Sequence, residues 1–368
     1  MLLNKKIIVV LYGGSVVELD FSNDIDAILN MFLPGQNGGS ATFNLLYGVK
    51  TPSGKLAETW VNSIKDIPFI SEYSKNQVEV YKESVFVGYR YYESKGKSVK
   101  YPFGYGLSYT TFSYSDMSLY RQGDKINVSC TVENVGDYVG AEVVQLYVRA
   151  PKKQIFRPAK ELKGFAKIYL DKGEKKKVEI ELNLDDLKYY DVKLKKFVLD
   201  GGEYVFELSS DSQTVKLSSN LLLDGESSCP YEREVLDCYN GDLDMVDAKI
   251  FEKMSRLEIP LIPNKKPITL NSRFTDLKLT PLGKLLFKAV LSIPNKQLRK
   301  AKRLPKGKEK DNKIKGAIFL KRVLESNTLN CMSMAEGRRF PYNFAEGFMH
   351  LANGRVLKGI ASFCKKIK

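Results

Sequence analysis

Histidine is almost absent from this sequence, because His350 is the only one among 368 residues. A serine triad, a Cys–His pair or a histidine-based metal site would have to use that residue, which we interpret as a structural histidine on a helix face. The five cysteines are an odd number at wide spacing, with no C-x-x-C: Cys130, Cys229, Cys238, Cys331 and Cys364. This pattern argues against a disulfide framework and a zinc site and suits a reducing compartment. We therefore predict neither a bound metal nor a cofactor.

Long hydrophobic runs are also missing. No apolar stretch approaches the roughly 20 residues that a membrane-spanning helix needs. The longest run near the start, residues 7–11, is shorter than the roughly 7–15-residue core of a signal peptide. We therefore predict a soluble, unexported, cytoplasmic chain.

Charge is plentiful but uneven. The formal net charge is +15. Residues 296–322 hold twelve Lys or Arg against Glu309 and Asp311, a net of +10. This segment also contains Pro305 and Gly307, and we interpret it as a solvated linker rather than a helix that reads a nucleic-acid groove. Binding of phosphate or anionic lipid there is the alternative. Because the linker interpretation is preferred, nucleic acid is not the favoured partner and a membrane role is not expected.

Residues 1–111 read as α/β. The all-apolar run at 7–11 has the character of a strand covered on both faces. A helix is expected after Asp24 up to Leu33, and a second one capped by Ser40 and ending at Gly48. A strand followed by two helices is an α/β signature, although so short a region supplies few neighbours for a central strand.

Residues 112–225 alternate apolar and polar side chains with period two, in runs near 126–132, 144–148, 178–182 and 204–208. Turn signals separate the runs, such as Asp171-Lys172-Gly173. Short alternating strands with regular turns predict an antiparallel β-sandwich.

Residues 226–368 form the third predicted region, a helical and basic extension. Thr280 followed by Pro281 predicts a helix start, and Pro294 its end. An apolar stripe from Phe344 to Phe363, interrupted at residues 353–354, predicts two short helices that dock on the same protein. The alternative is a basic amphipathic helix on a membrane surface.

Four segments strongly resemble the glycoside hydrolase family 3 β-glucosidases: LPGQNGGSA at 33–41, PSGKLAETW at 52–60, VGYRYY at 87–92 and YPFGYGLSYT at 101–110. The words at 133–136, 140–148 and 158–165 resemble the fibronectin type III-like domain that closes many members of that family. The resemblance covers about residues 5–223 firmly, and the third region loosely resembles the C-terminal extension of some anaerobic bacterial members.

The resemblance implies a retaining mechanism with two carboxyl groups about 5–5.5 Å apart. The family places its nucleophile, an aspartate, on a (β/α) barrel. Its acid/base glutamate lies in the early part of the α/β sandwich domain, upstream of the motif at 33–41. We expect this sequence to hold neither, so no catalytic residue is assigned. Glu58 sits inside a family-like word and Glu83 shortly before one, but neither matches a catalytic position.

The aromatic residues of these words have two interpretations: Tyr89, Tyr91, Tyr92, Tyr101, Phe103, Tyr105 and Tyr109. They could form a platform on which sugars stack, or they could pack the α/β part against the β-domain, which we favour. Trp60, the single tryptophan, is expected to be buried for the same reason.

The leading hypothesis is therefore the C-terminal part of a family 3 β-glucosidase-like enzyme: a partial α/β sandwich domain, a fibronectin-like domain and a helical extension. Such a chain is expected to be inactive alone. It would act on a β-glycoside only if completed by a barrel-bearing chain, for which an upstream-encoded partner is the candidate. The alternatives are a non-catalytic carbohydrate- or protein-binding β-sandwich module, or an anionic-surface binder through residues 296–322.

Overall fold

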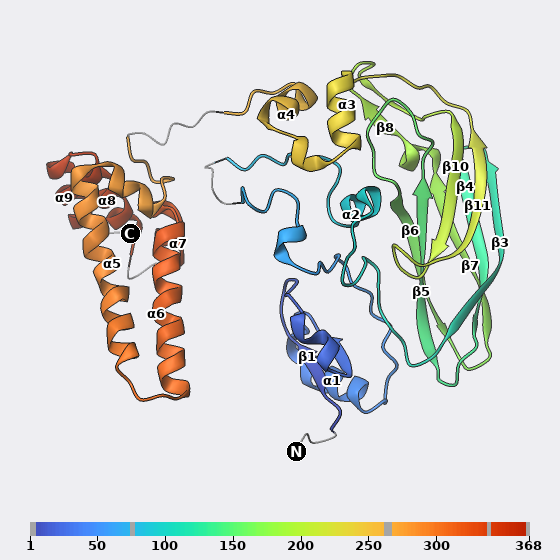
Figure 1. The fold of residues 1–368 in the computed structure, drawn as a ribbon, viewed down its shortest axis with the longest axis horizontal. Helices are drawn as coiled ribbons and strands as arrows, with labels where there is room; N and C mark the ends of the chain where they lie inside the picture. Colours follow the sequence, from blue (N-terminus) through green and yellow to red (C-terminus); the bar gives the residue numbers. More distant parts are fainter. Residues whose placement is uncertain (1–4, 74–77, 261–266, 337–339, 366–368) are drawn as a thin grey trace. The chain divides into compact units, whose positions relative to one another are not determined.

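The computed structural model describes residues 5–73, 78–260, 267–336 and 340–365. The chain forms two compact units, residues 1–260 and 261–368 (Figure 1). The first unit holds an α/β piece, a β-sandwich and two helices that follow it, and the second is helical. The expected boundary at residue 225 thus falls inside the first unit.

The α/β piece contains a two-stranded parallel sheet. Strands β1 (Ile8–Leu11) and β2 (Ala27–Asn30) pair with Ile8 opposite Ala27 and Leu11 opposite Asn30. Helix α1 (Gly38–Leu46) follows, and α2 (Tyr89–Lys95) comes later, after the segment 52–60. The strand expected at 7–11 and the helix expected before Gly48 are both present, but the helix begins at Gly38 with Asn37 as its N-cap, so Ser40 lies inside it rather than capping it.

Two predictions about this piece were wrong. The segment after Asp24 is not a helix, because the backbone is extended at Ile25 and then continues as β2. Its apolar residues suit a helix face and a short strand equally well, and the ladder with β1 selects the strand. Nor is β1 covered on both faces, since Ile8 is 52% exposed. The remainder of β1 is only half-buried.

The β-sandwich consists of two antiparallel sheets and confirms the fold expected from the alternating runs. One sheet has the order β3–β4–β7 and the other β11–β10–β5–β6. Their bounds are β3 Phe112–Gln122, β4 Lys125–Asn134, β5 Gly140–Arg149, β6 Glu161–Leu170, β7 Lys175–Asn183, β10 Gly202–Ser209 and β11 Val215–Leu223. A small hairpin, β8 (Tyr189–Asp191) and β9 (Lys196–Val198), connects β7 to β10.

The sandwich core is formed by the inward side chains of the alternating strands. Ile126, Val132, Val144, Leu146 and Phe206 are almost completely buried. On β7 the side chains alternate between buried apolar and exposed polar, which is the pattern of a sheet with one face in solvent, whereas β5 is buried along most of both faces. Burial of each large apolar side chain stabilises the fold by roughly 1.5–3 kcal/mol, so we expect the sandwich to be the most stable part of the first unit.

A second core lies where α2 meets the helices that follow the sandwich. Helices α3 (Arg233–Asn240) and α4 (Ala248–Ser255) bury Val235, Tyr239 and Ile250. These side chains cluster with Tyr91 and Tyr92 of α2 and with Phe86 and Phe156. The chain beyond residue 225 thus helps to hold the α/β piece.

The second unit has five α-helices within its described residues: α5 Pro281–Lys302, α6 Lys308–Ser326, α7 Leu329–Glu336, α8 Tyr342–Ala352 and α9 Val356–Cys364. Helices α5 and α6 run side by side as a hairpin (Figure 1). The core of this unit is built around Phe274, Phe287, Leu329 and Ala345. The two short helices expected around the break at 353–354 are present and pack on one another.

Two predictions about this unit need correction. Thr280 caps α5 by accepting a hydrogen bond from the amide of Gly283, as expected, but the helix continues through Pro294 to Lys302. Pro294 is buried with Leu291 and Ala301, and this packing outweighs the hydrogen bond that proline removes. The segment 296–322 is not a linker either, because it belongs to α5 and α6, which bury Ala301 and Ala317.

Candidate functional site

The family-like words at 52–60 and 101–110 come together as one irregular ribbon. The amide of Leu56 donates to the carbonyl of Tyr105 at 2.8 Å, and the amide of Gly104 donates back to Leu56 at 2.8 Å. Trp60 and Tyr101 exchange a second pair of backbone hydrogen bonds. Segments that are 40 residues apart in sequence therefore form one surface, which contacts strand β5 of the sandwich. We call these contacts the seam.

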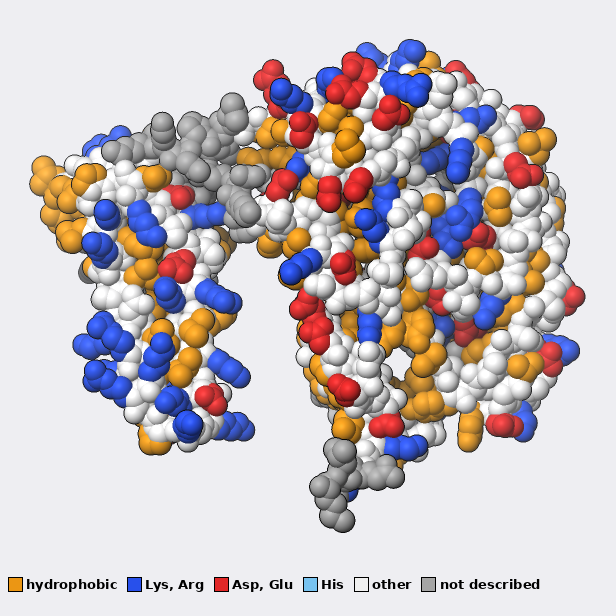
Figure 2. Space-filling model, viewed as in Figure 1, with side chains coloured by type: hydrophobic (Ala, Val, Ile, Leu, Met, Phe, Trp, Pro, Cys, Tyr) orange, Lys and Arg blue, Asp and Glu red, His pale blue; other side chains and the backbone are white. Residues whose placement is uncertain are grey.

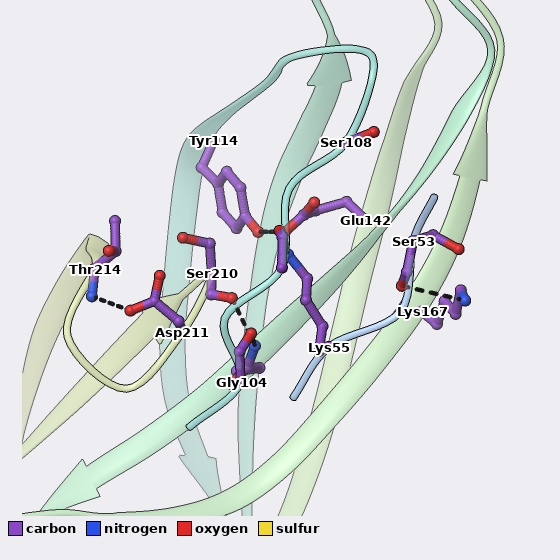
Figure 3. Close-up of polar contacts among 12 residues, drawn as sticks. Ser53, Lys55, Gly104, Ser108, Tyr114, Glu142, Lys167, Ser210, Asp211 and Thr214 are labelled. Atoms are coloured by element: carbon purple, nitrogen blue, oxygen red, sulfur yellow. Dashed lines mark hydrogen bonds and ion pairs between the residues drawn. The ribbon is translucent and has the colours of Figure 1, made fainter. Parts of the chain in front are cut away.

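A buried ion pair crosses the seam. Lys55 Nζ lies 3.4 Å from Glu142 Oε1 and donates to the carbonyl of Gly106 at 3.0 Å. The hydroxyl of Tyr114 donates to the same carboxylate oxygen at 3.1 Å. Burial, together with the negative charge of Glu142, raises the pKa of Tyr114 well above its ordinary value. Figure 3 shows Lys55 and Tyr114 converging on Glu142.

Gln145 forms a second polar contact across the seam. Its Nε2 donates to the carbonyls of Gly104 and Ser210 at 3.1 and 2.6 Å, and its Oε1 accepts from Tyr147 at 2.7 Å. Gly104 has φ +79°, and a Cβ atom there would lie 2.1 Å from Gln145 Oε1. Glycine is therefore required by both the backbone conformation and the close approach.

The β10–β11 turn completes the seam. Asp211 Oδ1 accepts from the amides of Gln213 and Thr214 at 2.8 Å each, which fixes the turn (Figure 3). The amide of Ser212 then donates to the carbonyl of Phe103 at 2.8 Å, and its hydroxyl to Glu93 at 2.9 Å. The seam is thus held by charged, amide and backbone groups from both sides.

The aromatic side chains of the family-like words are engaged in packing. Tyr89 stacks on Phe103 with ring centroids 4.8 Å apart, and its hydroxyl accepts from the amide of Leu162. Tyr101 stacks on Tyr105 at 5.2 Å and meets Trp60 edge to face. Trp60, Tyr91 and Tyr92 are buried. The expected packing against the β-domain is seen for Tyr89, whose ring also meets Tyr147 edge to face, whereas Tyr91 and Tyr92 cluster with the helices that follow the sandwich. Tyr109, half-exposed, donates to the carbonyl of Leu45.

A further buried ion-pair cluster joins β5 to β10 and to the segment before β6. Glu207 accepts from Lys160 Nζ at 3.1 Å and from Arg149 Nε. Lys160 is almost completely buried and its ammonium group lies over the Tyr147 ring. Removing one member of a buried ion pair lowers the free energy of unfolding, so we assign these three residues a structural role.

The hairpin β8–β9 carries a buried carboxylate. Asp191 Oδ1 accepts from the amides of Lys193 and Leu194 at 2.8 Å each, and the Ser228 hydroxyl donates to Oδ2. Burial alone would raise the pKa of Asp191, but the hydrogen bonds from Ser228 and the two amides hold it below its ordinary value. Ser228 and Cys229 also line a surface pocket, with Lys152, Lys153, Gln154 and Ser227.

The residues considered for catalysis are separate from one another. Glu58 is exposed, Glu83 is half-buried, and neither forms an ion pair within the described part of the chain. His350 is a half-buried residue of helix α8, in the other unit. Among the described residues no group of His, Cys, Asp and Glu could hold a metal ion. The residues that do converge, Lys55, Glu142 and Gln145, lie within the family-like words, and this position was the available signal for them.

The comparisons with known proteins agree with the two parts of the first unit. Residues 2–109 match the glycosyl hydrolase family 3 C-terminal domain, and residues 142–212 match the fibronectin type III-like domain. The chain therefore carries the C-terminal domain of glycosyl hydrolase family 3, followed by its fibronectin-like partner. No (β/α) barrel is present in the part of the chain that the structure describes.

Particular relatives show which segment of such proteins is matched. The thermostable β-glucosidase B of Acetivibrio thermocellus is 40% identical over 58% of this chain and 29% of its own length. The exo-α-(1→6)-L-arabinopyranosidase of Bifidobacterium breve is 35% identical over 71% of this chain and 35% of its own. The structure of β-glucosidase 3B from Thermotoga neapolitana with α-D-glucose superposes with a TM-score of 0.58 at 37% identity. The match covers 60% of this chain and 32% of that one. The chain thus spans about a third of these relatives.

Proposed function

We propose that this chain supplies the C-terminal part of a family 3 glycosidase and that hydrolysis requires a barrel-bearing polypeptide. The observation that carries the proposal is the ordered match of residues 2–109 and 142–212 to two domains of such enzymes. The relatives in which these domains occur are about three times longer than the matched segment.

The chemistry requires the second polypeptide. A retaining glycosidase uses one carboxyl group as nucleophile and another as acid and then base. The resemblance places the nucleophile on the barrel and the acid/base residue upstream of residue 33, and no residue of this sequence matches either. General acid–base catalysis is typically worth 10²–10⁴-fold, so the chain alone is expected to be inactive on glycosides.

The α/β piece offers the surface on which completion would occur. The side chains of Ile8 and Phe43 are 52% and 54% exposed, and Leu33 and Tyr47 are also exposed. The sheet β1–β2 has only two strands, so each has an edge without a ladder partner among the described residues. Further strands that pair with this sheet would bury the apolar side chains.

The substrate is a glycoside, and the reaction releases its terminal sugar. It needs no metal or organic cofactor. Glucose linked through a β-bond is the first candidate, because relatives are named β-glucosidases. An α-linked L-arabinopyranoside is the second, because a relative with wide coverage of this chain carries that name.

The test is hydrolysis of a chromogenic aryl β-glucoside, with the aryl α-L-arabinopyranoside measured alongside. The chain is assayed alone and mixed with the polypeptide encoded upstream. We expect activity only in the mixture, together with co-elution of the two chains on size exclusion. Activity of the chain alone, or an inactive mixture, would overturn the proposal.

A matched pair of variants locates the contact. Phe43→Asp alters an exposed phenylalanine that stacks on Tyr47 in the α/β piece. Phe197→Asp alters another exposed phenylalanine, which lies beside Tyr190 on the β8–β9 hairpin. Co-elution and activity should fall with Phe43→Asp and persist with Phe197→Asp.

A further inference from the structure

The helical unit carries a concentration of positive charge that the glycosidase assignment does not use. Twelve Lys and Arg residues lie at positions 296–322 of α5, α6 and the turn between them, against Glu309 and Asp311. We call residues 296–322 the basic hairpin. Figure 2 shows blue side chains gathered over these two helices.

Most of these cations have no acidic partner. Lys313 pairs with Glu309, and Lys321 pairs with Glu325. The other ten form no ion pair within the described residues: Lys296, Arg299, Lys300, Lys302, Arg303, Lys306, Lys308, Lys310, Lys315 and Arg322. All of them except the half-buried Lys310 are exposed. The hairpin therefore keeps like charges close together without compensation, which costs stability unless an anionic surface neutralises them.

The charge is interspersed with exposed apolar side chains. On α5, Leu285 and Ile293 are 66% and 55% exposed. By helical spacing they share a face with Lys296 and Lys300, opposite the buried Leu291.

The second helix repeats this combination. Phe319 of α6 is 70% exposed. Lys315 and Arg322 lie one turn on either side of it. Ala317 and Leu324, on the opposite face, are buried. Each helix of the hairpin thus turns both cations and apolar groups toward solvent.

We propose that the basic hairpin binds the surface of an anionic lipid bilayer. Cations would meet lipid phosphates, while Ile293 and Phe319 would enter the boundary between headgroups and acyl chains. A nucleic acid would satisfy the charge but would leave these aliphatic and aromatic groups exposed, so the lipid surface fits more of the observations. No helix among the described residues is long and apolar enough to cross a membrane, so the contact is with the surface.

The basis of this proposal differs from the sequence-based interpretation. A solvated linker would have distributed the charge over a mobile chain, whereas two helices hold it beside apolar side chains at fixed spacing. The helices that carry the basic hairpin, α5 and α6, are anchored in the core of their unit through Phe287, Leu291 and Leu324. Binding would therefore not require the helices to form at the membrane, and it does not depend on glycoside hydrolysis.

The test is co-sedimentation of the full chain with vesicles of phosphatidylcholine alone and of phosphatidylcholine with 30% phosphatidylglycerol, in low and high salt. The variant Lys300→Gln/Arg303→Gln/Lys306→Gln/Lys308→Gln removes four hairpin charges. Since each removed cation is lost from the attraction to the anionic surface, binding should weaken by at least about tenfold. A second variant, Ile293→Ser/Phe319→Ser, keeps the charge and should also weaken binding.

The matched control removes four exposed cations from the other unit. Lys97, Lys152, Lys153 and Lys216 are exposed and form no ion pair within the described residues. Their change to Gln lowers the net charge equally and should leave vesicle binding within about twofold. Circular dichroism checks that each variant keeps its helices.

Three results would overturn the proposal. They are absence of binding to the anionic vesicles, equal loss in the hairpin and control variants, and tighter binding to a 20-base-pair DNA duplex that the Ile293→Ser/Phe319→Ser variant retains. The last result would assign the hairpin to nucleic acid.

Discussion

At the scale of single residues, the seam depends on groups that have no freedom to change. Gly104 adopts a positive φ and approaches Gln145 closely, while Lys55 compensates the buried carboxylate of Glu142. Lys55 belongs to the α/β piece and Glu142 to strand β5 of the sandwich. Because an uncompensated buried charge costs several kcal/mol, the two parts stabilise each other through these contacts.

Gly104→Ala tests this closeness against a matched glycine. Gly173 also has a positive φ, +74°, but a Cβ atom there meets nothing within 4 Å. Gly173→Ala should therefore cost only the backbone strain, about 1 kcal/mol. Gly104→Ala should cost about 2 kcal/mol more, because Gln145 must move and lose its hydrogen bonds. Urea unfolding followed by Trp60 fluorescence and circular dichroism measures both, and equal effects would contradict the role of the contact.

At the scale of elements, the β8–β9 hairpin has a predicted pH dependence. The pKa of Asp191 is lower in the folded chain than its ordinary value near 3.9. Its contribution to the free energy of unfolding is therefore complete above that value and is lost as the pH falls through the lower, folded pKa.

Asp191→Asn should thus destabilise the chain at pH 6, and this effect should shrink as the pH falls below the ordinary carboxyl pKa of about 3.9. Urea midpoints across this range give the measurement, with the exposed Asp224→Asn as control. A difference between wild type and Asp191→Asn that stays constant with pH would contradict the assignment.

Elements also show how far the sequence alone can lead. Alternation of period two predicted the sandwich strands because strands such as β7 have one buried apolar face and one exposed polar face, a property that any correct pairing preserves. The segment 27–30 was wrongly predicted to be helical because three apolar residues in a row do not distinguish a helix from a strand until a partner strand is known. Pro294 and the charges of 296–322 suggested an end and a linker, but neither indicates how much a helix gains by burying Leu291 or Leu324.

The candidate site was predictable only in part. The family-like words indicated which segments matter, and their aromatic residues were expected to pack. The pairing of Lys55 with Glu142 joins residues 87 positions apart, and Gln145 meets Gly104 through a backbone carbonyl. Such contacts depend on the docking of one domain on another, which no local pattern records.

At the scale of the whole molecule, stability should be uneven. The sandwich has a continuous buried core, whereas the sheet β1–β2 and helix α1 leave apolar side chains in solvent. We expect amide hydrogen exchange to be slow in β4, β5 and β10 and much faster in β1, β2 and α1. Equal, slow protection in both regions would contradict this, and addition of the upstream polypeptide should slow exchange in β1 and β2 selectively.

The open face of the α/β piece has a consequence for the amount of protein in a cell. Chaperones and proteases recognise exposed apolar chain, and small differences in stability change abundance several-fold. A polypeptide that covers Ile8 and Phe43 would remove that signal. On the proposed assignment, the lifetime of this chain would be set by the supply of its complement, and surplus copies would be degraded until the two were present in equal numbers.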